Sequence, residues 1–414
     1  MKADEARDAG KAASAGLRTG TGLIRDIHGG ISHGVYAVVD ALAGPAARPI
    51  RVVQDTITEG VYAVTGRGLD VGSRLVGAAV AARKARSGAD HASLHDGPAA
   101  HHVIAIGSGL IDDSLVGQVP SLRPTMHVRE RGTRVELTRE GVGAAYPEAT
   151  DEIVVFLHGL VETEAAWRLS AKTRPPYADR LRADLGLTPV MVRYNTGLRV
   201  SENGRLFAGL LADLVEAWPV PVRRIALIGH SMGGLIIHSA FAQVEDDPAT
   251  QWRGLVTDTI TLGTPHHGSP LARGAFAATA WLGRSRHTRT AAQVMRARSG
   301  SVRDLAHGNI LAADWESLDV EELVDGRTHP APAMGILHRA VGAAWGKAHP
   351  DGGHDRLSDF LVPVTSATHA HLAGEARRFT EDDIAVVHGT HHLGLLNSEE
   401  TYQHLLRWLT PANP

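Results

Sequence analysis

Ser231 lies at the centre of the pentapeptide Gly-His-Ser-Met-Gly, which occupies positions 229–233. Residues 225–228 before it form an uncharged aliphatic run typical of a buried strand, and residues 235–241 after it have apolar side chains at helical spacing. A serine at such a strand-to-helix turn can present its hydroxyl as a nucleophile, and the turn needs glycines because strand and helix approach closely. The pattern therefore predicts a nucleophilic Ser231; the alternative is a Gly-Ser turn without chemistry.

A serine hydroxyl is a poor nucleophile at neutral pH, so Ser231 needs a histidine as base and a carboxylate that orients this histidine. When the nucleophile sits on such a turn, the acid and then the histidine follow it along the chain. The segment 387–396 offers His388, His391 and His392. We prefer His392, because the apolar residues 393–396 that follow can anchor its backbone, and His391 is the alternative.

The preferred acid is Asp359, which directly precedes the apolar turn at residues 360–364. Asp351 and Asp355 are flanked by glycine, histidine and arginine, so we expect them to be solvated. Ser231, Asp359 and a histidine would together allow attack on an acyl carbon and protonation of a leaving alcohol.

The negative oxygen of such an intermediate needs preorganised N–H donors. We expect one from the amide of Met232, after the nucleophile, and one from the amide of Leu160, in the His158-Gly159-Leu160 loop after a predicted strand. His158 and Gly159 are therefore predicted to line the substrate site. Among the candidates for substrate contact we also count His266, which follows another predicted strand at the expected rim of the pocket.

The composition narrows the function classes. The 414 residues carry a formal charge of −3, which predicts no nucleic-acid partner, and no cysteine, which excludes disulfides and thiolate chemistry. Histidines cluster at 266–267, 349–354 and 369–371, but we predict no metal site, because a site needs convergent ligands and serine chemistry gains nothing from a metal. The polar first residues lack a signal-peptide pattern, and the longest uncharged run in the N-terminal region, residues 75–82, is too short to span a bilayer. We therefore expect a soluble, cytoplasmic protein.

Strand and helix patterns alternate from about residue 124 onward, which predicts an α/β fold with a mostly parallel, doubly wound sheet. Residues 126–129 and 134–138 predict an antiparallel hairpin; the other expected strands are 153–157, 189–195, 225–228, 257–262, 334–338 and 384–387. Helices are expected at 206–218 and 399–409. The stretch 269–330 interrupts the alternation and predicts a helical cap or lid over the site.

The first 92 residues predict amphipathic helices, with the pentapeptide Gly-Val-Tyr-Ala-Val occurring at 34–38 and again at 60–64. Their apolar faces must be buried, either on protein or on a lipid surface. Residues 93–123 predict a linker with a short helix near Ile111, and residues 124–414 the catalytic domain.

The motifs at 229–234 and 262–269 and the segment 392–396 resemble those of α/β-hydrolase lipases and esterases, in particular bacterial triacylglycerol lipases and serine esterases of the GPI inositol-deacylase kind. Residues 359–366 are similar to the family's acid segment, although Phe360 stands where the family usually has glycine. The resemblance supports His392 and implies ester hydrolysis without a cofactor.

We therefore expect a serine esterase or lipase that cleaves esters with apolar acyl chains through an acyl-enzyme. Two alternatives stay open. One is an acyltransferase or polyester depolymerase with the same triad; the other is a lipid-surface-binding protein in which residues 1–92 matter and the hydrolase domain is vestigial.

Overall fold

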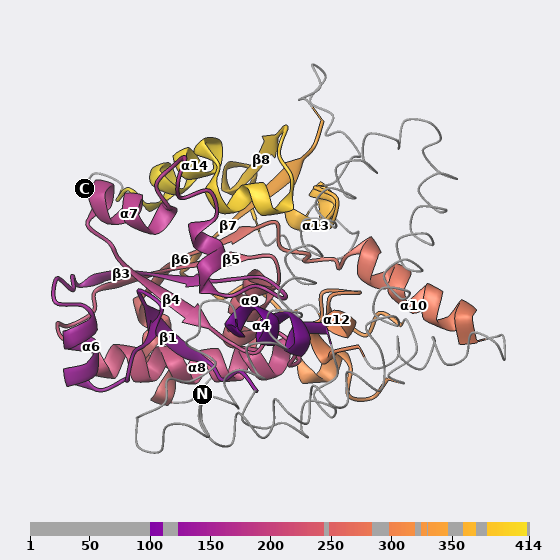
Figure 1. Cartoon of the computed structure of the whole chain (residues 1–414), viewed down its shortest axis with the longest axis horizontal. Helices are drawn as coiled ribbons and strands as arrows, with labels where there is room; N and C mark the ends of the chain where they lie inside the picture. The colour runs from indigo at the N-terminus through magenta and orange to yellow at the C-terminus, as the bar shows by residue number, and fades with distance from the viewer. Residues whose placement is uncertain are drawn as a thin grey trace, which may run out of the picture. The chain divides into compact units, whose positions relative to one another are not determined.

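The computed structural model describes residues 100–110, 123–243, 248–283, 298–318, 324–328, 330–346, 359–369 and 379–411 (Figure 1). The chain divides into two units, and the larger one consists of Thr125–Arg273 and Ser299–Pro414. The other unit contains helix α4 (Ala100–Leu110), which lies within the predicted linker. The helices predicted within residues 1–92 lie outside the described residues.

An eight-stranded sheet forms the centre of the larger unit, with the strand order β2-β1-β4-β3-β5-β6-β7-β8. Strands β3 to β8 pair parallel with one another, whereas β1 pairs antiparallel with both β2 and β4. This arrangement confirms the predicted mostly parallel sheet with an antiparallel opening hairpin. The strands are β1 (His127–Glu130), β2 (Thr133–Arg134), β3 (Glu152–Leu157), β4 (Thr188–Arg193), β5 (Arg224–His230), β6 (Val256–Leu262), β7 (Leu337–Ala344) and β8 (Ile384–His388).

Helices cover both faces of this sheet (Figure 1). Helices α6, α8 and α9 contribute to the hydrophobic cluster on one face, and α7 and α14 to the cluster on the other. Their bounds are α6 (Arg139–Ala145), α7 (Tyr177–Leu185), α8 (Val200–Ala217), α9 (Met232–Ala242) and α14 (Glu399–Leu409). Short 3-10 helices lie at η4 (Glu164–Arg168), η5 (Pro248–Leu255), η7 (Glu381–Asp383) and η8 (His392–Asn397), and a short α-helix, α13, at Val364–Ala367.

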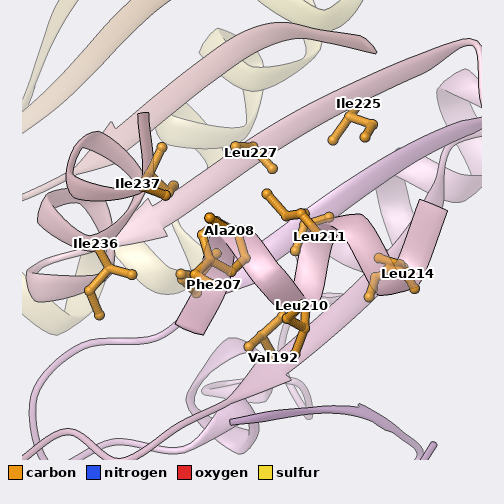
Figure 2. Close-up of a cluster of buried hydrophobic side chains, with 14 of the residues drawn as sticks. Val192, Phe207, Ala208, Leu210, Leu211, Leu214, Ile225, Leu227, Ile236 and Ile237 are labelled. Atoms are coloured by element: carbon orange, nitrogen blue, oxygen red, sulfur yellow. The ribbon is translucent and has the colours of Figure 1, made fainter. Parts of the chain in front are cut away.

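The two clusters follow from the alternation of side chains along a strand. In β3, Val155 packs in the cluster with α8, while Val154 and Phe156 pack in the cluster with α7. Figure 2 shows Phe207 and Leu211 of α8 among the side chains of the first cluster. Each such fully buried side chain contributes about 1.5–3 kcal/mol by leaving water.

The structure corrects two strands of the predicted sheet. The second strand of the hairpin was predicted at 134–138, but β2 contains only Thr133–Arg134. We predicted a strand at 334–338, but β7 begins at Leu337 and runs to Ala344. Gly335 has a φ of 78°, which marks a turn, and Met334 is 95 % exposed. The strand itself is rich in alanine and glycine, residues of low β propensity, and is specified by pairing with β6 and β8.

The insertion at 269–330 contains α10 (Pro270–Gly283), α12 (Gly300–Asp304) and η6 (Ala312–Asp314) among its described residues. Its role as a lid stays a prediction. In the part of the chain that the structure describes, no helix has the length and apolar character to cross a bilayer.

Candidate active site

Ser231 stands between the end of β5 and the first residue of α9, at the predicted turn. Its backbone has a φ of 52° and a ψ of −121°, a conformation that costs a non-glycine residue about 1–3 kcal/mol. Two neighbouring glycines permit the turn. A Cβ atom on Gly229 would lie 2.5 Å from the Gly234 nitrogen, and one on Gly233 would lie 2.5 Å from the Leu157 oxygen.

Hydrogen bonds from the β6 end of the sheet hold this strained backbone. The Ser231 amide donates to the Leu262 oxygen over 2.8 Å, and the Thr264 hydroxyl donates to the Ser231 carbonyl oxygen over 2.9 Å. The amide of Gly234 donates to the same carbonyl. The strain is therefore maintained by the surrounding structure.

Asp359 and His392 form a buried pair. The Nδ1 atom of His392 lies 2.6 Å from Asp359 Oδ2, and the side chains are 5 % and 0 % exposed. The amide of His392 also donates to the Asp359 carbonyl oxygen over 3.2 Å. The other carboxylate oxygen, Oδ1, accepts from the amides of Leu361 and Val362. Sequence reasoning thus selected two side chains that the structure brings together across 33 residues.

The environment of His392 favours its charged form. Burial alone lowers the pKa of the ring, but the charge and hydrogen bond of Asp359, with a smaller contribution from the charge of Glu162, raise the pKa above the usual value. A base with this environment can accept a proton from a neighbouring hydroxyl and keep the resulting charge stabilised.

His230, the residue before Ser231, links the turn to this pair. The ring centroids of His230 and His392 lie 4.7 Å apart, and His230 Nε2 lies 3.3 Å from the His392 carbonyl oxygen. Among the described residues, no hydrogen bond joins the Ser231 hydroxyl to the His392 ring. Catalytic hydrogen bonds are often formed only with substrate present, so the complete triad stays a prediction.

The predicted oxyanion loop lies against the nucleophile. A Cβ atom on Gly159 would be 3.1 Å from Ser231 Cβ, a contact so tight that a side chain here would require its neighbours to shift by a few tenths of an ångström. Neither the amide of Leu160 nor that of Met232 donates to another residue within the described part of the chain. Met232 begins α9, where the helix dipole favours negative charge.

Sequence reasoning missed Glu162. Its Oε2 atom accepts the Gly159 amide over 2.7 Å and lies 3.2 Å from His230 Nδ1. Burial pushes its pKa upward, but the charge of His230 and the hydrogen bonds from His230 and Gly159 hold the pKa below the usual range. The carboxylate therefore joins the oxyanion loop to the nucleophile turn. The only sequence signal is an acid shortly after the His-Gly loop, which alone predicts nothing.

The two predicted substrate-contact histidines occupy other environments. His158 is fully buried, its ring stacks 4.3 Å from that of Tyr194, and its carbonyl oxygen accepts the Tyr194 hydroxyl. Burial lowers the pKa of His158. His266 lines a cavity of about 30 Å³ with His238, Arg327 and other residues, a lining that includes neither Ser231 nor His392. Substrate contact by His158, Gly159 and His266 stays a prediction.

The two alternative bases contact other residues. His388 Nδ1 lies 3.3 Å from the Gly346 carbonyl oxygen, and the ring of His391 lies 6.4 Å from that of Trp345. Asp351 and Asp355 lie outside the described residues. Among the residues that the structure describes, no group of three histidine or acidic side chains could hold a metal ion.

A comparison with protein families finds one similar family. Residues 210–333 match the family model described as PGAP1-like alpha/beta domain, a range that includes Ser231 but neither Asp359 nor His392. The matched range includes the strained turn at Ser231 and two of the parallel strands, β5 and β6. The chain has an α/β-hydrolase fold. The resemblance expected from the sequence motifs is confirmed.

Solved structures similar to this α/β-hydrolase include three named as lipases or a phospholipase. The mature form of lipase BlEst2 from Bacillus licheniformis is 18 % identical, with a TM-score of 0.39 over 63 % of this chain and 92 % of that one. Lipase B of Aspergillus fumigatus is 12 % identical, with a TM-score of 0.39 over 70 % of this chain and 57 % of that one. Phospholipase PlaB of Legionella pneumophila is 17 % identical, with a TM-score of 0.39 over 64 % and 60 %. No curated protein matches the chain.

Proposed function

We propose that the chain is a serine carboxylester hydrolase in which Ser231 is the nucleophile, His392 the base and Asp359 the orienting acid. One observation carries the proposal: a buried carboxylate–histidine pair, joined over 2.6 Å, contacts His230, the residue before a serine whose backbone is held at a φ of 52°. A surface histidine or an ordinary turn would need neither the burial nor the strain.

In the proposed reaction, the Ser231 hydroxyl attacks the acyl carbon while His392 Nε2 takes its proton. Because Nδ1 of His392 is engaged by Asp359, the ring presents Nε2 to the reacting atoms. The tetrahedral intermediate then collapses: its bond to the alcohol oxygen breaks and His392 gives the proton to that oxygen. Water, activated by the same histidine, attacks the acyl-serine and releases the acid and free Ser231.

The amides of Leu160 and Met232 are the proposed donors to the oxyanion. Met232 follows the nucleophile and Leu160 follows Gly159, which lies against Ser231; neither amide donates to another described residue. Loss of a single donor of this kind typically costs about 10²–10³ in kcat. No metal or other cofactor takes part in the proposed steps.

The proposed substrates are esters with apolar acyl chains. The apolar insertion at 269–330 and the amphipathic pattern of residues 1–92 favour a hydrophobic substrate and peripheral contact with a lipid surface. An acyltransferase or polyester depolymerase would use the same three residues. Product analysis with a competing alcohol separates hydrolysis from acyl transfer.

The test is hydrolysis of p-nitrophenyl esters from acetate to palmitate by the full chain. We expect Ser231→Ala and His392→Ala each to lower kcat by at least about 10³-fold, whereas His388→Ala, the matched control in the same segment, keeps most activity. A fluorophosphonate probe should label the wild type and not Ser231→Ala. Full activity in Ser231→Ala, or no hydrolysis of any ester by the wild type, would refute the proposal; the latter result favours the lipid-surface alternative.

A further inference from the structure

Two aromatic residues are the sequence neighbours of Asp359 and His392, and a third contacts both of them. Trp345 follows the carboxyl end of β7, Phe360 follows Asp359, and His391 precedes His392. The ring centroids of Trp345 and Phe360 are 5.1 Å apart, and those of Trp345 and His391 are 6.4 Å apart. These separations are typical of aromatic rings in contact. We call Trp345, Phe360 and His391 the aromatic rim.

Hydrogen bonds fix the loops that carry the rim. The amide of Gly389 donates to the Gly346 carbonyl oxygen over 3.2 Å, and the amide of Thr390 donates to the Ala344 carbonyl oxygen over 3.4 Å. The loop after β7 is thereby joined to the loop after β8. The carboxyl ends of parallel strands are where α/β proteins bind ligands, so the rim stands where a substrate would.

The rim leaves apolar surface in water. Trp345 is 39 % exposed, and Leu361, next to Phe360, is 37 % exposed. Burial and the charge of His392 lower the pKa of His391, which favours the neutral ring and suits an apolar surface. Large exposed apolar side chains that gather beside a reactive site are typical of a binding surface.

The backbone of Phe360 gives independent evidence. Its φ is 80°, in the left-handed region that glycine adopts freely and other residues do not. The turn requires this conformation, because Asp359 Oδ1 accepts the amides of Leu361 and Val362. A phenylalanine here works against the local backbone preference, and such strain concentrates at functional sites. The strain at Phe360 therefore supports a functional role for this side chain.

The position of His392 indicates which half of the ester the rim would meet. His392 must reach the leaving oxygen to protonate it, so the alcohol moiety lies on the histidine side of the reacting carbon. The rim flanks the loops of His392 and Asp359. We propose that the aromatic rim binds the apolar alcohol moiety of the ester, such as a benzyl or medium alkyl group, and so determines alcohol specificity. This inference rests on the proposed ester hydrolysis at Ser231.

The experiment compares two ester series with the full chain. In the first, the acyl group is acetyl and the alcohol is methanol, butanol, octanol or benzyl alcohol. In the second, the alcohol is ethanol and the acyl chain varies. For the wild type, kcat/KM should rise with the apolar surface of the alcohol. Phe360→Ala and Trp345→Ala should each lower the benzyl-to-methyl ratio by about fivefold or more and change the acyl series by less than about twofold.

A glycine variant separates binding from folding. Phe360→Gly should lose the benzyl preference as Phe360→Ala does, yet raise the melting temperature by about 2–4 °C, because glycine relieves the positive φ. Leu206→Ala is the control: Leu206 is 48 % exposed on α8, and its removal should leave the ratio unchanged.

The outcomes are distinct. A benzyl-to-methyl ratio that is unchanged in both alanine variants, while Ser231→Ala is inactive, refutes the rim and leaves the proposed hydrolase intact. A loss confined to the acyl series refutes it too, since the rim would then bind the other half. Full activity in Ser231→Ala overturns the ester hydrolysis and the rim with it.

Discussion

Replacement of Glu162 by glutamine would test how the oxyanion loop is held. Glu162 Oε2 accepts the Gly159 amide and lies 3.2 Å from His230 Nδ1. Glutamine keeps the shape of the side chain but removes its charge, and its NH₂ group can take the place of one acceptor oxygen. The loop that carries Leu160 would then lose its link to the nucleophile turn.

The magnitude follows from the hydrogen bonds that are weakened. A hydrogen bond to a charged group contributes about 1.5–3 kcal/mol, and the Glu162 side chain is 13 % exposed, so solvent screens it little. If that free energy is lost mainly from the transition state, kcat/KM falls by about 10- to 100-fold, at about 1.4 kcal/mol per tenfold change. The charge of Glu162 also contributes to the raised pKa of His392. The acidic limb of the pH profile should therefore move to lower pH in Glu162→Gln.

The assay is kcat/KM for p-nitrophenyl butyrate between pH 5 and pH 9, together with thermal unfolding. Glu164→Gln is the matched control, because Glu164 is a neighbouring carboxylate that pairs with Arg193 over 2.5 Å. We expect Glu164→Gln to lower stability without moving the acidic limb. An unchanged limb and an unchanged kcat/KM in Glu162→Gln would refute the reasoning.

Three further predictions concern packing and titration. Gly233→Ala should destabilise the fold by about 1–3 kcal/mol or more, since its Cβ would lie 2.5 Å from backbone, whereas Gly209→Ala, with no atom within 4 Å, should be neutral or stabilising in a denaturant titration. Because the pKa of His392 is raised above 6.5, wild-type kcat/KM should fall as the pH drops through that raised pKa; Asp359→Asn should lower the pKa and reduce kcat by roughly 10⁴-fold, measured as a pH–rate profile. Burial raises the pKa of Asp304 from 3.8 to about 6, so this group favours the folded state at low pH and that stability is lost as the pH rises from about 4 to 6, by roughly 3 kcal/mol. Asp304→Asn should remove this part of the pH dependence of the unfolding free energy.

The sequence predicted those parts of the fold whose pattern is local. Strands β3 and β5 are continuous aliphatic runs, and both were found within two residues of the expected ends. Helix α7 was missed because it is short and carries mixed charge. Contacts distant in sequence stabilise it, such as the hydrogen bond from the Tyr177 hydroxyl to the Leu395 carbonyl oxygen, 218 residues away.

The same limit applies to the site. Asp359 and His392 could be selected because apolar segments follow each of them and because the chain order of the residues is informative. Glu162 could not, since its partner His230 is 68 residues away and a single acid after a loop has many possible roles. The aromatic rim depends on ring contacts between two loops, which no local pattern specifies.

The two carboxylate oxygens of Asp359 have separate tasks: Oδ1 accepts two amides of its own turn, and Oδ2 binds His392. These three hydrogen bonds fix the orientation of the carboxylate. The two backbone amides restrict the length of the side chain, and the imidazole favours its negative charge. A glutamate at this position, one methylene longer, could satisfy the amides or the ring but not both. A redesign that moves the acid to another strand must therefore also reproduce the turn whose amides bind the carboxylate.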